Sequence, residues 1–234
     1  GLWEAWNDDD YSIDILDQFI LRDSYAQYGT FAQKTITDGW VKYDVYDMGG
    51  GQRSVGAYAL MNKYKYLPAF AGSAVLDADG LNAAAQLLAE GKTLPHPAGE
   101  LIVTPHPGEM ARLTGLSAAQ INADREETAR TYAQKWNAVV VLKGSRTVVA
   151  APDGRACVNP TGNPGLARGG SGDVLSGMTA ALLACGLPAY QAAACAVYLH
   201  GAAADRTAAV LGEYGMLPHD ILPQLGRIFA EHQR

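Results

Sequence analysis

The sequence predicts an α/β fold in which a mostly parallel β-sheet is flanked by helices and extended by an antiparallel hairpin. From residue 71 onwards, short apolar stretches of strand length alternate with stretches of helical periodicity, a pattern typical of parallel α/β sheets. Residues 138–144 read AVVVLKG, and this continuous apolar run is typical of a strand buried on both faces. Residues 146–160 contain the turn signal PDG at 152–154, which predicts a hairpin.

The first 70 residues differ in character from the rest of the chain. They hold 14 of the 20 aromatic residues, whereas most of the alanines come later. We therefore expect an N-terminal segment of uncertain origin over 1–70 and one α/β domain over 71–234. Within the segment, the patterns predict a helix over 11–28, a strand over 39–48, and a glycine turn followed by a helix over 49–66.

In the second part, each element has its own local signal. Ser117 is a good N-cap for the helical periodicity that follows it, and Gly115 is a good residue to end the helix before it. The expected strands cover 73–79, 99–104 and 138–144, and the expected helices cover 108–115, 117–136, 173–184, 188–211 and 218–231. Ligands of such sheets bind at the carboxyl ends of the strands. We therefore expect three stretches to converge on one rim: Asp77 with Asp79, Thr104–Glu109, and Lys143–Thr147.

The composition argues against a nucleic-acid-binding protein and against a membrane protein. A hydrophobic content of 48% with 18% charged residues predicts a globular core, and a net charge of -6 gives no basic surface for a nucleic acid. No apolar run approaches the roughly 18 residues that span a bilayer. The chain has three cysteines without CxxC spacing and opens without a signal-peptide pattern, so we expect a cytoplasmic protein that binds neither nucleic acid nor membrane.

The stretch GNPGLARGGSGDVLSG at 162–177 is the strongest chemical signal. Its glycines permit positive φ and a close backbone approach, and a helix that begins near Gly172 would present free N–H groups to an anion. Asp173 could then accept the proton of an attacking hydroxyl while the glycine amides hold a phosphoryl group. The alternative is an ordinary helix start. No lysine follows the last glycine as in a Walker A loop, and the spacing is not that of a dinucleotide fold.

Two further stretches offer candidate ligand contacts. In TPHPGEM, His106 lies between two prolines, so it is either a pre-placed ligand contact or a solvated loop histidine. Glu109 could cap the next helix, contact a ligand or hold Mg²⁺ through water, and we favour the cap. In LDADGLN, Asp79 and Asn82 are candidate substrate contacts, because paired acids can hold Mg²⁺ or a ribose hydroxyl; one acid could instead be an N-cap.

The stretch LKGSRTVV follows the most apolar strand. It is either a plain turn between strands or a platform for a nucleotide, where small residues admit a ribose or phosphate. The candidate nucleotide contacts here are Lys143, Gly144, Ser145, Arg146 and Thr147. His200, in YLHGAAAD, is interpreted as a packed, hydrogen-bonded histidine of an alanine-rich helix.

Taken in order, VLDADGLN, TPHPGEMARLTG, VVVLKGSRTVV, GNPGLARGGSGDVLSGMTAALLA and YLHGAAAD resemble the ADP/ATP-dependent NAD(P)H-hydrate dehydratase family, over about residues 71–230. The resemblance implies a ribokinase-like fold. It also implies an enzyme, a hydro-lyase, that restores NADH or NADPH from their hydrates. ADP or ATP with Mg²⁺ would phosphorylate the ring hydroxyl, and elimination of phosphate would follow.

The resemblance also implies roles for individual residues. Asp173 would be the base at the hydroxyl, and Gly170, Ser171 and Gly172 would form the anion hole. His106 would contact the hydrated dinucleotide, and the stretch Lys143–Thr147 with Gly172 would contact the adenine nucleotide. No set of resident metal ligands is assigned. Residues 1–70 do not show the Gly- and Ala-rich opening of the family.

Two other functions stay open at this point. The chain could be a kinase for a small molecule such as a vitamin precursor, although such kinases should lack TPHPGEM. It could also be a catalytically silent nucleotide-binding module, because the first 70 residues lack the family opening. The alanine-rich helices at 188–211 and 218–231 could pack on their own sheet or on another subunit, so a homo-oligomer is expected as one outcome.

Overall fold

The structure is a computed structural model, and it describes residues 32–38, 41–49, 52–58 and 72–232. The chain divides into two compact units, Gly1–Tyr66 and Leu67–Arg234, and each is described by itself. The boundary expected near residue 70, and the uncertain origin of the segment before it, stay predictions. Among the described residues, no helix is both long and apolar enough to cross a bilayer.

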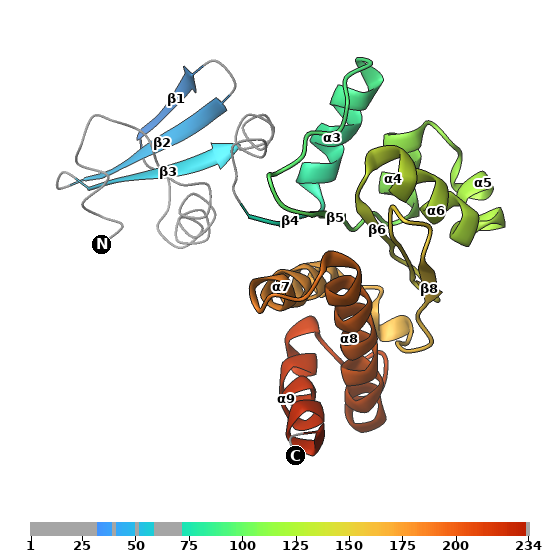
Figure 1. Cartoon of the computed structure of the whole chain (residues 1–234). Helices are drawn as coiled ribbons and strands as arrows, with labels where there is room; N and C mark the ends of the chain where they lie inside the picture. Colours follow the sequence, from blue (N-terminus) through green and yellow to red (C-terminus); the bar gives the residue numbers. More distant parts are fainter. Residues whose placement is uncertain (1–31, 39–40, 50–51, 59–71, 233–234) are drawn as a thin grey trace. The chain divides into compact units, whose positions relative to one another are not determined.

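The described part of the first unit is an antiparallel sheet of three strands, in the order β1-β2-β3 (Figure 1). These are β1 (Ala32–Asp38), β2 (Val41–Gly49) and β3 (Gln52–Tyr58). The strand predicted at 39–48 is confirmed by β2. The helix predicted after the glycine turn is wrong where the structure describes it, since 52–58 pairs with β2 as a strand. Pairing with a neighbouring strand overrode the local helical pattern. The helix predicted over 11–28 lies outside the described residues.

The second unit contains a sheet of five strands in the order β4-β5-β6-β7-β8. Strands β4, β5 and β6 are parallel, whereas β7 and β8 form the added antiparallel hairpin. The strands are β4 (Ala74–Leu76), β5 (Leu101–Val103), β6 (Val139–Leu142), β7 (Val148–Ala150) and β8 (Ala156–Val158). The α/β fold with a parallel portion and a hairpin is therefore confirmed.

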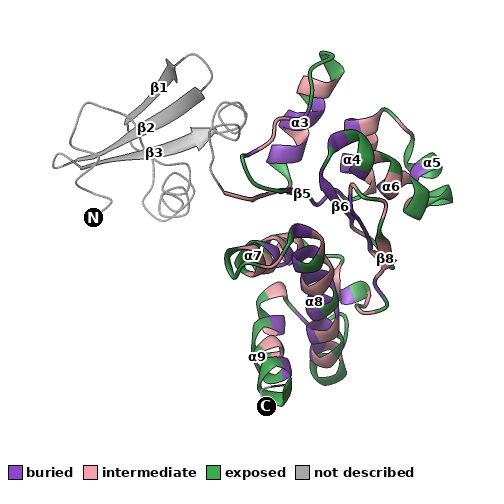
Figure 2. Ribbon diagram, in the orientation of Figure 1, coloured by how far each residue is buried: buried purple, intermediate pink, exposed green. Residues whose placement is uncertain are grey.

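Helices pack on this sheet, with α3 to α6 lying apart from α7 to α9 in Figure 1. The helices are α3 (Asp79–Ala89), α4 (Pro107–Thr114), α5 (Ala118–Ala123), α6 (Arg125–Trp136), α7 (Ser171–Ala184), α8 (Ala189–Leu211) and α9 (Ile221–His232), with short 3-10 turns η2 (Pro164–Leu166) and η3 (Pro218–Asp220). Strands β5, β6 and β7 are buried along their whole length, and Figure 2 shows β5 and β6 in purple.

Small residues let α8 approach the sheet closely. Ala193 and Ala196 are fully buried and pack in one cluster with Ile102, Val139 and Val141 of the central strands. Alternate residues of a strand point to opposite faces, so Val139 and Val141 share the face that meets α8. This packing places the start of α7 and the middle of α8 near the carboxyl ends of the parallel strands.

Helix boundaries follow from capping. The Ser117 hydroxyl accepts from the backbone N–H of Gln120 at 3.2 Å, and Gly115 ends α4 with φ of 77°, so both predictions are confirmed. The single helix predicted over 117–136 is wrong, because the chain breaks at Asp124. That carboxylate accepts from the backbone N–H of Glu127 at 3.0 Å and caps a second helix, α6.

Candidate active site

The ends of the three parallel strands meet in a charged cluster, as the sequence predicts for one rim. The Lys143 ammonium after β6 lies 2.6 Å from Asp77 Oδ1 after β4 and 3.7 Å from Glu109 Oε2 on α4. The hydroxyl of Ser176 on α7 donates to Asp77 Oδ2 at 2.8 Å. The cluster therefore ties the rim of the sheet to the first half of α7.

The environment keeps Asp77 ionised. Burial by itself would raise the pKa of this carboxyl. However, the hydrogen bond and charge of Lys143, the Ser176 hydroxyl and the Ala78 N–H together outweigh burial, so the pKa of Asp77 is lowered from its ordinary value. The side chains of Lys143 and Asp77 are 19% and 13% exposed, so solvent screens this pair less than a surface ion pair.

The first turn of α7 lies against this ion pair. Gly170 precedes the helix with φ of 93°, a left-handed conformation that suits glycine. A Cβ placed on Gly172 would lie 3.5 Å from Asp77 Oδ2 and 3.6 Å from Lys143 Nζ. The helix start and the ammonium are thus neighbours. Together they can bind an anion, because free N–H groups and the positive end of the helix dipole attract negative charge.

Asp173 lies in the same first turn of α7 and its side chain is exposed. Within the described part of the chain, the Asp173 carboxylate has neither a hydrogen-bond partner nor an ion-pair partner. Its carboxylate is therefore available to a ligand at the helix start.

His106 is the N-cap of α4. Its Nδ1 accepts from the N–H groups of Gly108 at 3.0 Å and Glu109 at 3.3 Å, while Glu109 Oε2 accepts from the His106 N–H at 2.7 Å. These bonds assign the proton of the neutral ring to Nε2, which lies 3.6 Å from Glu109 Oε1. The ring is about half exposed. The capping role expected of Glu109 is confirmed. The sequence analysis did not predict His106 as the N-cap, although proline at N1 and glutamate at N3 are local signals for one.

Asp79 and Asn82 lie at the start of α3. The Asn82 Oδ1 accepts from Arg112 Nε at 2.9 Å, and its amide nitrogen lies 3.5 Å from Asp79 Oδ1. The structure places these two residues near the end of β4, but not in the pocket described next.

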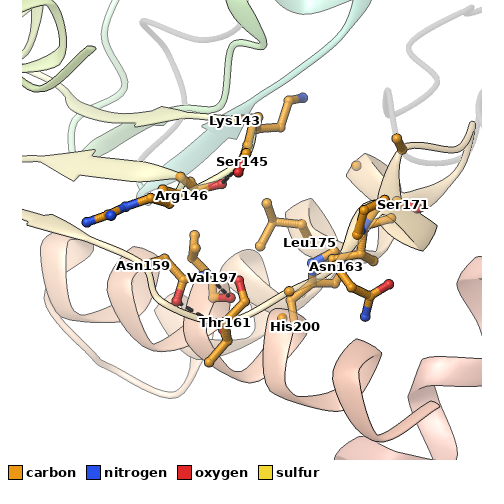
Figure 3. Close-up of a pocket in the computed structure, with 18 of the residues that line it drawn as sticks. Lys143, Ser145, Arg146, Asn159, Thr161, Asn163, Ser171, Leu175, Val197 and His200 are labelled. Atoms are coloured by element: carbon orange, nitrogen blue, oxygen red, sulfur yellow. Dashed lines mark hydrogen bonds between the residues drawn. The ribbon is translucent and has the colours of Figure 1, made fainter. Parts of the chain in front are cut away.

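A pocket of about 610 Å³ opens beside the charged cluster (Figure 3). Its walls are the turn 143–147, the loop 159–164, the first turn of α7 at Ser171 and Gly172, and the middle of α8 at Val197, His200 and Gly201. The volume is ordinary for a site that holds a small organic ligand.

The pocket contains part of the predicted site and adds residues to it. The whole stretch Lys143–Thr147 lines it with Ser171 and Gly172, whereas Gly170, Asp173, His106, Asp79 and Asn82 do not. The sequence analysis assigned no ligand contact to the loop 159–164, although the GNP at 162–164 belongs to the stretch that it singled out. It interpreted His200 only as a packed, hydrogen-bonded residue.

Arg125 on α6 holds the turn 143–147 through hydrogen bonds to its backbone. Its Nη2 donates to the carbonyls of Leu142 at 2.8 Å and Lys143 at 3.2 Å. Gly144 lies directly against this guanidinium, with φ of 149°, so a side chain there would meet Arg125. The turn is therefore held in one conformation from the side of α6. No sequence signal identified Arg125, because its contacts depend on packing.

Comparison with known families and proteins agrees with this geometry. A family model described as NAD(P)H-hydrate dehydratase matches residues 27–227, a range that includes part of the N-terminal segment. The ADP-dependent (S)-NAD(P)H-hydrate dehydratase of Neisseria meningitidis is 43% identical over 178 residues, which cover 75% of this chain and 58% of the relative. The bifunctional NAD(P)H-hydrate repair enzyme Nnr of Moorella thermoacetica is 52% identical over 156 residues, which cover 67% and 29%. The chain thus matches less than two thirds of the length of these relatives.

Solved structures identify the fold. The ADP/ATP-dependent NAD(P)H-hydrate dehydratase of Bacillus subtilis, co-crystallized with ATP/Mg²⁺, superposes with a TM-score of 0.66 at 37% identity, over 72% of this chain and 58% of that one. A ribokinase-like superfamily protein from Enterococcus faecalis superposes with a TM-score of 0.59 at 30% identity, over 68% and 52%. The predicted ribokinase-like fold is therefore confirmed.

Proposed function

The chain belongs to the NAD(P)H-hydrate dehydratase family, and from this premise we propose that it uses ADP or ATP to dehydrate the hydrates of NADH and NADPH. The observation that carries the proposal is the anion site at the start of α7. There, Gly172 lies beside the Lys143 ammonium at the edge of a pocket large enough for a nucleotide.

In the proposed reaction, Asp173 accepts the proton of the hydroxyl on the hydrated nicotinamide ring as that oxygen attacks the terminal phosphoryl group. The N–H groups at the start of α7, at Gly170, Ser171 and Gly172, and the ammonium of Lys143 stabilise the negative charge of the transferring phosphoryl group. The Ser171 N–H donates to the Arg168 carbonyl at 3.3 Å in the structure, so it must leave that bond to take part. Phosphate then leaves with the former hydroxyl oxygen, and loss of the neighbouring ring proton restores the conjugation of the reduced nicotinamide. These residues contribute by position and charge, without a covalent intermediate on the protein.

His106 is proposed as a contact to the hydrated dinucleotide. Because α4 capping occupies Nδ1, the protonated Nε2 of the half-exposed ring remains as a hydrogen-bond donor. Asp79 and Asn82 are proposed as further contacts to the hydrated dinucleotide. They lie at the end of β4, outside the nucleotide pocket, where the substrate would enter.

Mg²⁺ is proposed to arrive with the nucleotide. Within the described ranges, no three His, Cys, Asp or Glu side chains gather as a metal site, and Asp77 and Glu109 are already engaged by Lys143, Ser176 and the α4 cap. This donor set fits a cation held mainly by phosphate oxygens and water, with at most one carboxylate. Such an ion neutralises phosphate charge during transfer.

Location and assembly are also proposed. Three cysteines are free thiols, which supports a reducing compartment such as the cytoplasm. Exposed apolar side chains on and between α8 and α9, among them Val210, Leu211 and Phe229, support self-association. Size-exclusion chromatography with light scattering tests the second point.

The test is recovery of reduced-nicotinamide absorbance when hydrated NADH is incubated with the protein, ADP or ATP, and Mg²⁺. We expect recovery that depends on the nucleotide and is lost in Asp173→Asn. Nucleotide binding without any recovery would instead identify a silent nucleotide-binding module. Phosphorylation of a vitamin precursor without recovery would identify a small-molecule kinase.

A further inference from the structure

The pocket wall formed by α8 carries a histidine with an unused hydrogen-bonding atom. His200 is 7% exposed, and its Nε2 is buried without a hydrogen-bond partner among the described residues. The ring lines the pocket on the side opposite Lys143 and Ser145 (Figure 3). A buried polar atom without a partner costs about 1–3 kcal/mol, so such atoms in folded proteins normally meet water or a ligand.

Other polar side chains on this wall are already used within the protein. The Asn159 amide donates to the Thr161 carbonyl at 2.9 Å and accepts from the Thr161 hydroxyl at 3.0 Å. The Asn163 amide donates to Asp205 at 2.9 Å, and its oxygen accepts from the Gly165 N–H at 3.0 Å. On α8 and the loop 159–164, the imidazole of His200 is therefore the group with capacity to bind a ligand, and the buried hydroxyl of Ser171 at the start of α7 is a second such group in the pocket.

The position of His200 is rigid. Its neighbour Gly201 lies so close to the loop 159–164 that a Cβ there would come within 2.9 Å of the Gly162 nitrogen, and closer to Thr161. Helix α8 and this loop thus meet backbone to backbone beside His200. A ligand group that reaches this point would find an imidazole already in place, so little entropy is lost on binding.

The two ends of the pocket differ in chemistry. Near the turn 143–147 and the start of α7 lie the Lys143 ammonium and the helix N–H groups, which suit phosphate. Near His200, the pocket is lined by the apolar side chains of Val197 on α8 and Leu175 on α7. Burial keeps this imidazole neutral, since it lowers the pKa of His200 from 6.5 to about 4. A neutral ring offers one donor and one acceptor, which suits a base or a ribose better than a phosphate.

We propose that His200 is a direct contact to the nucleoside part of the bound adenine nucleotide, through a hydrogen bond at Nε2. The inference rests on the proposed function only for the identity of the ligand. It assigns the phosphates to the α7 end of the pocket and the base and ribose to the α8 end.

Matched substitutions test the contact. A glutamine amide reaches about as far as Nε2, whereas an asparagine amide reaches only as far as Nδ1. We expect His200→Asn to weaken binding of both ADP and adenosine roughly 3- to 10-fold, the effect of one net hydrogen bond, and His200→Gln to recover most of that loss. ADP is measured by calorimetry and adenosine by competition in NMR. Thr207→Val, a buried polar change two turns along α8, should bind both ligands as the wild type does.

The outcomes separate the inference from the proposed function. Wild-type affinity of His200→Asn for both ligands would overturn the contact, and so would a loss confined to ADP, which would place the histidine at the phosphates. If the wild-type protein binds neither ADP nor adenosine, the contact and the proposed function are both wrong. If ADP binds through His200 but hydrated NADH is not restored, the contact stands and the proposed reaction fails.

A measurement on the wild-type protein covers the case in which a variant does not fold. With ¹⁵N-labelled histidine, ADP should move the Nε2 resonance of His200 to a hydrogen-bonded position. An acid titration of the wild-type protein assigns the signal, because burial lowers the pKa of His200 to about 4. An Nε2 resonance that ADP leaves unchanged would refute the contact.

Discussion

Protonation of His200 should destabilise the fold in mild acid. Burial disfavours the imidazolium and lowers the pKa of His200 from 6.5 to about 4, although a hydrogen bond with the Ser171 backbone acts in the opposite direction. In the unfolded chain, a histidine is exposed to water and titrates near its ordinary value of about 6.5. As the pH falls between these two values, the unfolded state therefore takes up a proton that the folded state does not.

The sign and size of the effect follow from this difference. Stability is fully present above pH 6.5 and is lost as the pH falls towards the folded value of about 4. At about 1.36 kcal/mol for each pH unit, the loss reaches roughly 3 kcal/mol near pH 4. Asp77 acts in a different window: its pKa is lowered from 3.8, so its contribution is lost only below that pH.

Urea denaturation between about pH 8 and about pH 4 checks this prediction. Helical circular dichroism is the signal, since every described helix lies in the unit Leu67–Arg234. The free energy of unfolding of the wild type should fall about 3 kcal/mol more than that of His200→Gln, which cannot titrate there. His219→Gln is the matched control, because its ring is exposed, and it should follow the wild type.

A constant difference between wild type and His200→Gln over this pH range would refute the reasoning. An NMR titration gives a direct check, since the His200 imidazole resonances should stay those of a neutral ring down to about pH 5. Titration near the ordinary value would show that the ring is hydrated in solution.

Three other predictions concern the site and the core. Asp173→Asn should lower the turnover of hydrated NADH by at least about 100-fold, while calorimetry shows ADP affinity within about threefold of wild type; a variant as active as wild type would exclude Asp173 as the base. Asp77→Asn leaves the Lys143 ammonium poorly paired, so we expect urea denaturation to show a loss of about 2–4 kcal/mol, whereas the exposed control Glu90→Gln should cost under about 1 kcal/mol. Equal losses in these two variants would contradict the importance of burial. Ile121→Ala, at a fully buried position, should cost about 2–5 kcal/mol by the same measurement, and a loss below about 1 kcal/mol would mean that α5 packs more loosely than the structure shows.

Local patterns in the sequence determined most of the second unit. The apolar run that forms β6, the Ser117 cap and the terminal Gly115 each depend on neighbours within a few residues, so the signal is complete in the sequence. The turn Lys143–Thr147 and the glycines before Asp173 also follow from local patterns. The turn comes directly after a strand and lines the pocket, and the glycines lie at the start of a helix, in the pocket or beside it. The His106 cap was also local, and its signal was present.

Tertiary structure alone decided how these pieces meet. Lys143 and Asp77 lie 66 residues apart in sequence, and Ser176 and Asp77 lie 99 apart, so no local pattern could pair them. Within the stretch expected to form a helix before residue 66, the described residues 52–58 form β3 for the same reason, since their partner is another strand. His200 was expected to be a satisfied packed residue. Its buried, unpartnered Nε2 appears only when α8 closes the pocket, because burial and hydrogen-bond partners are properties of the folded packing rather than of the residue.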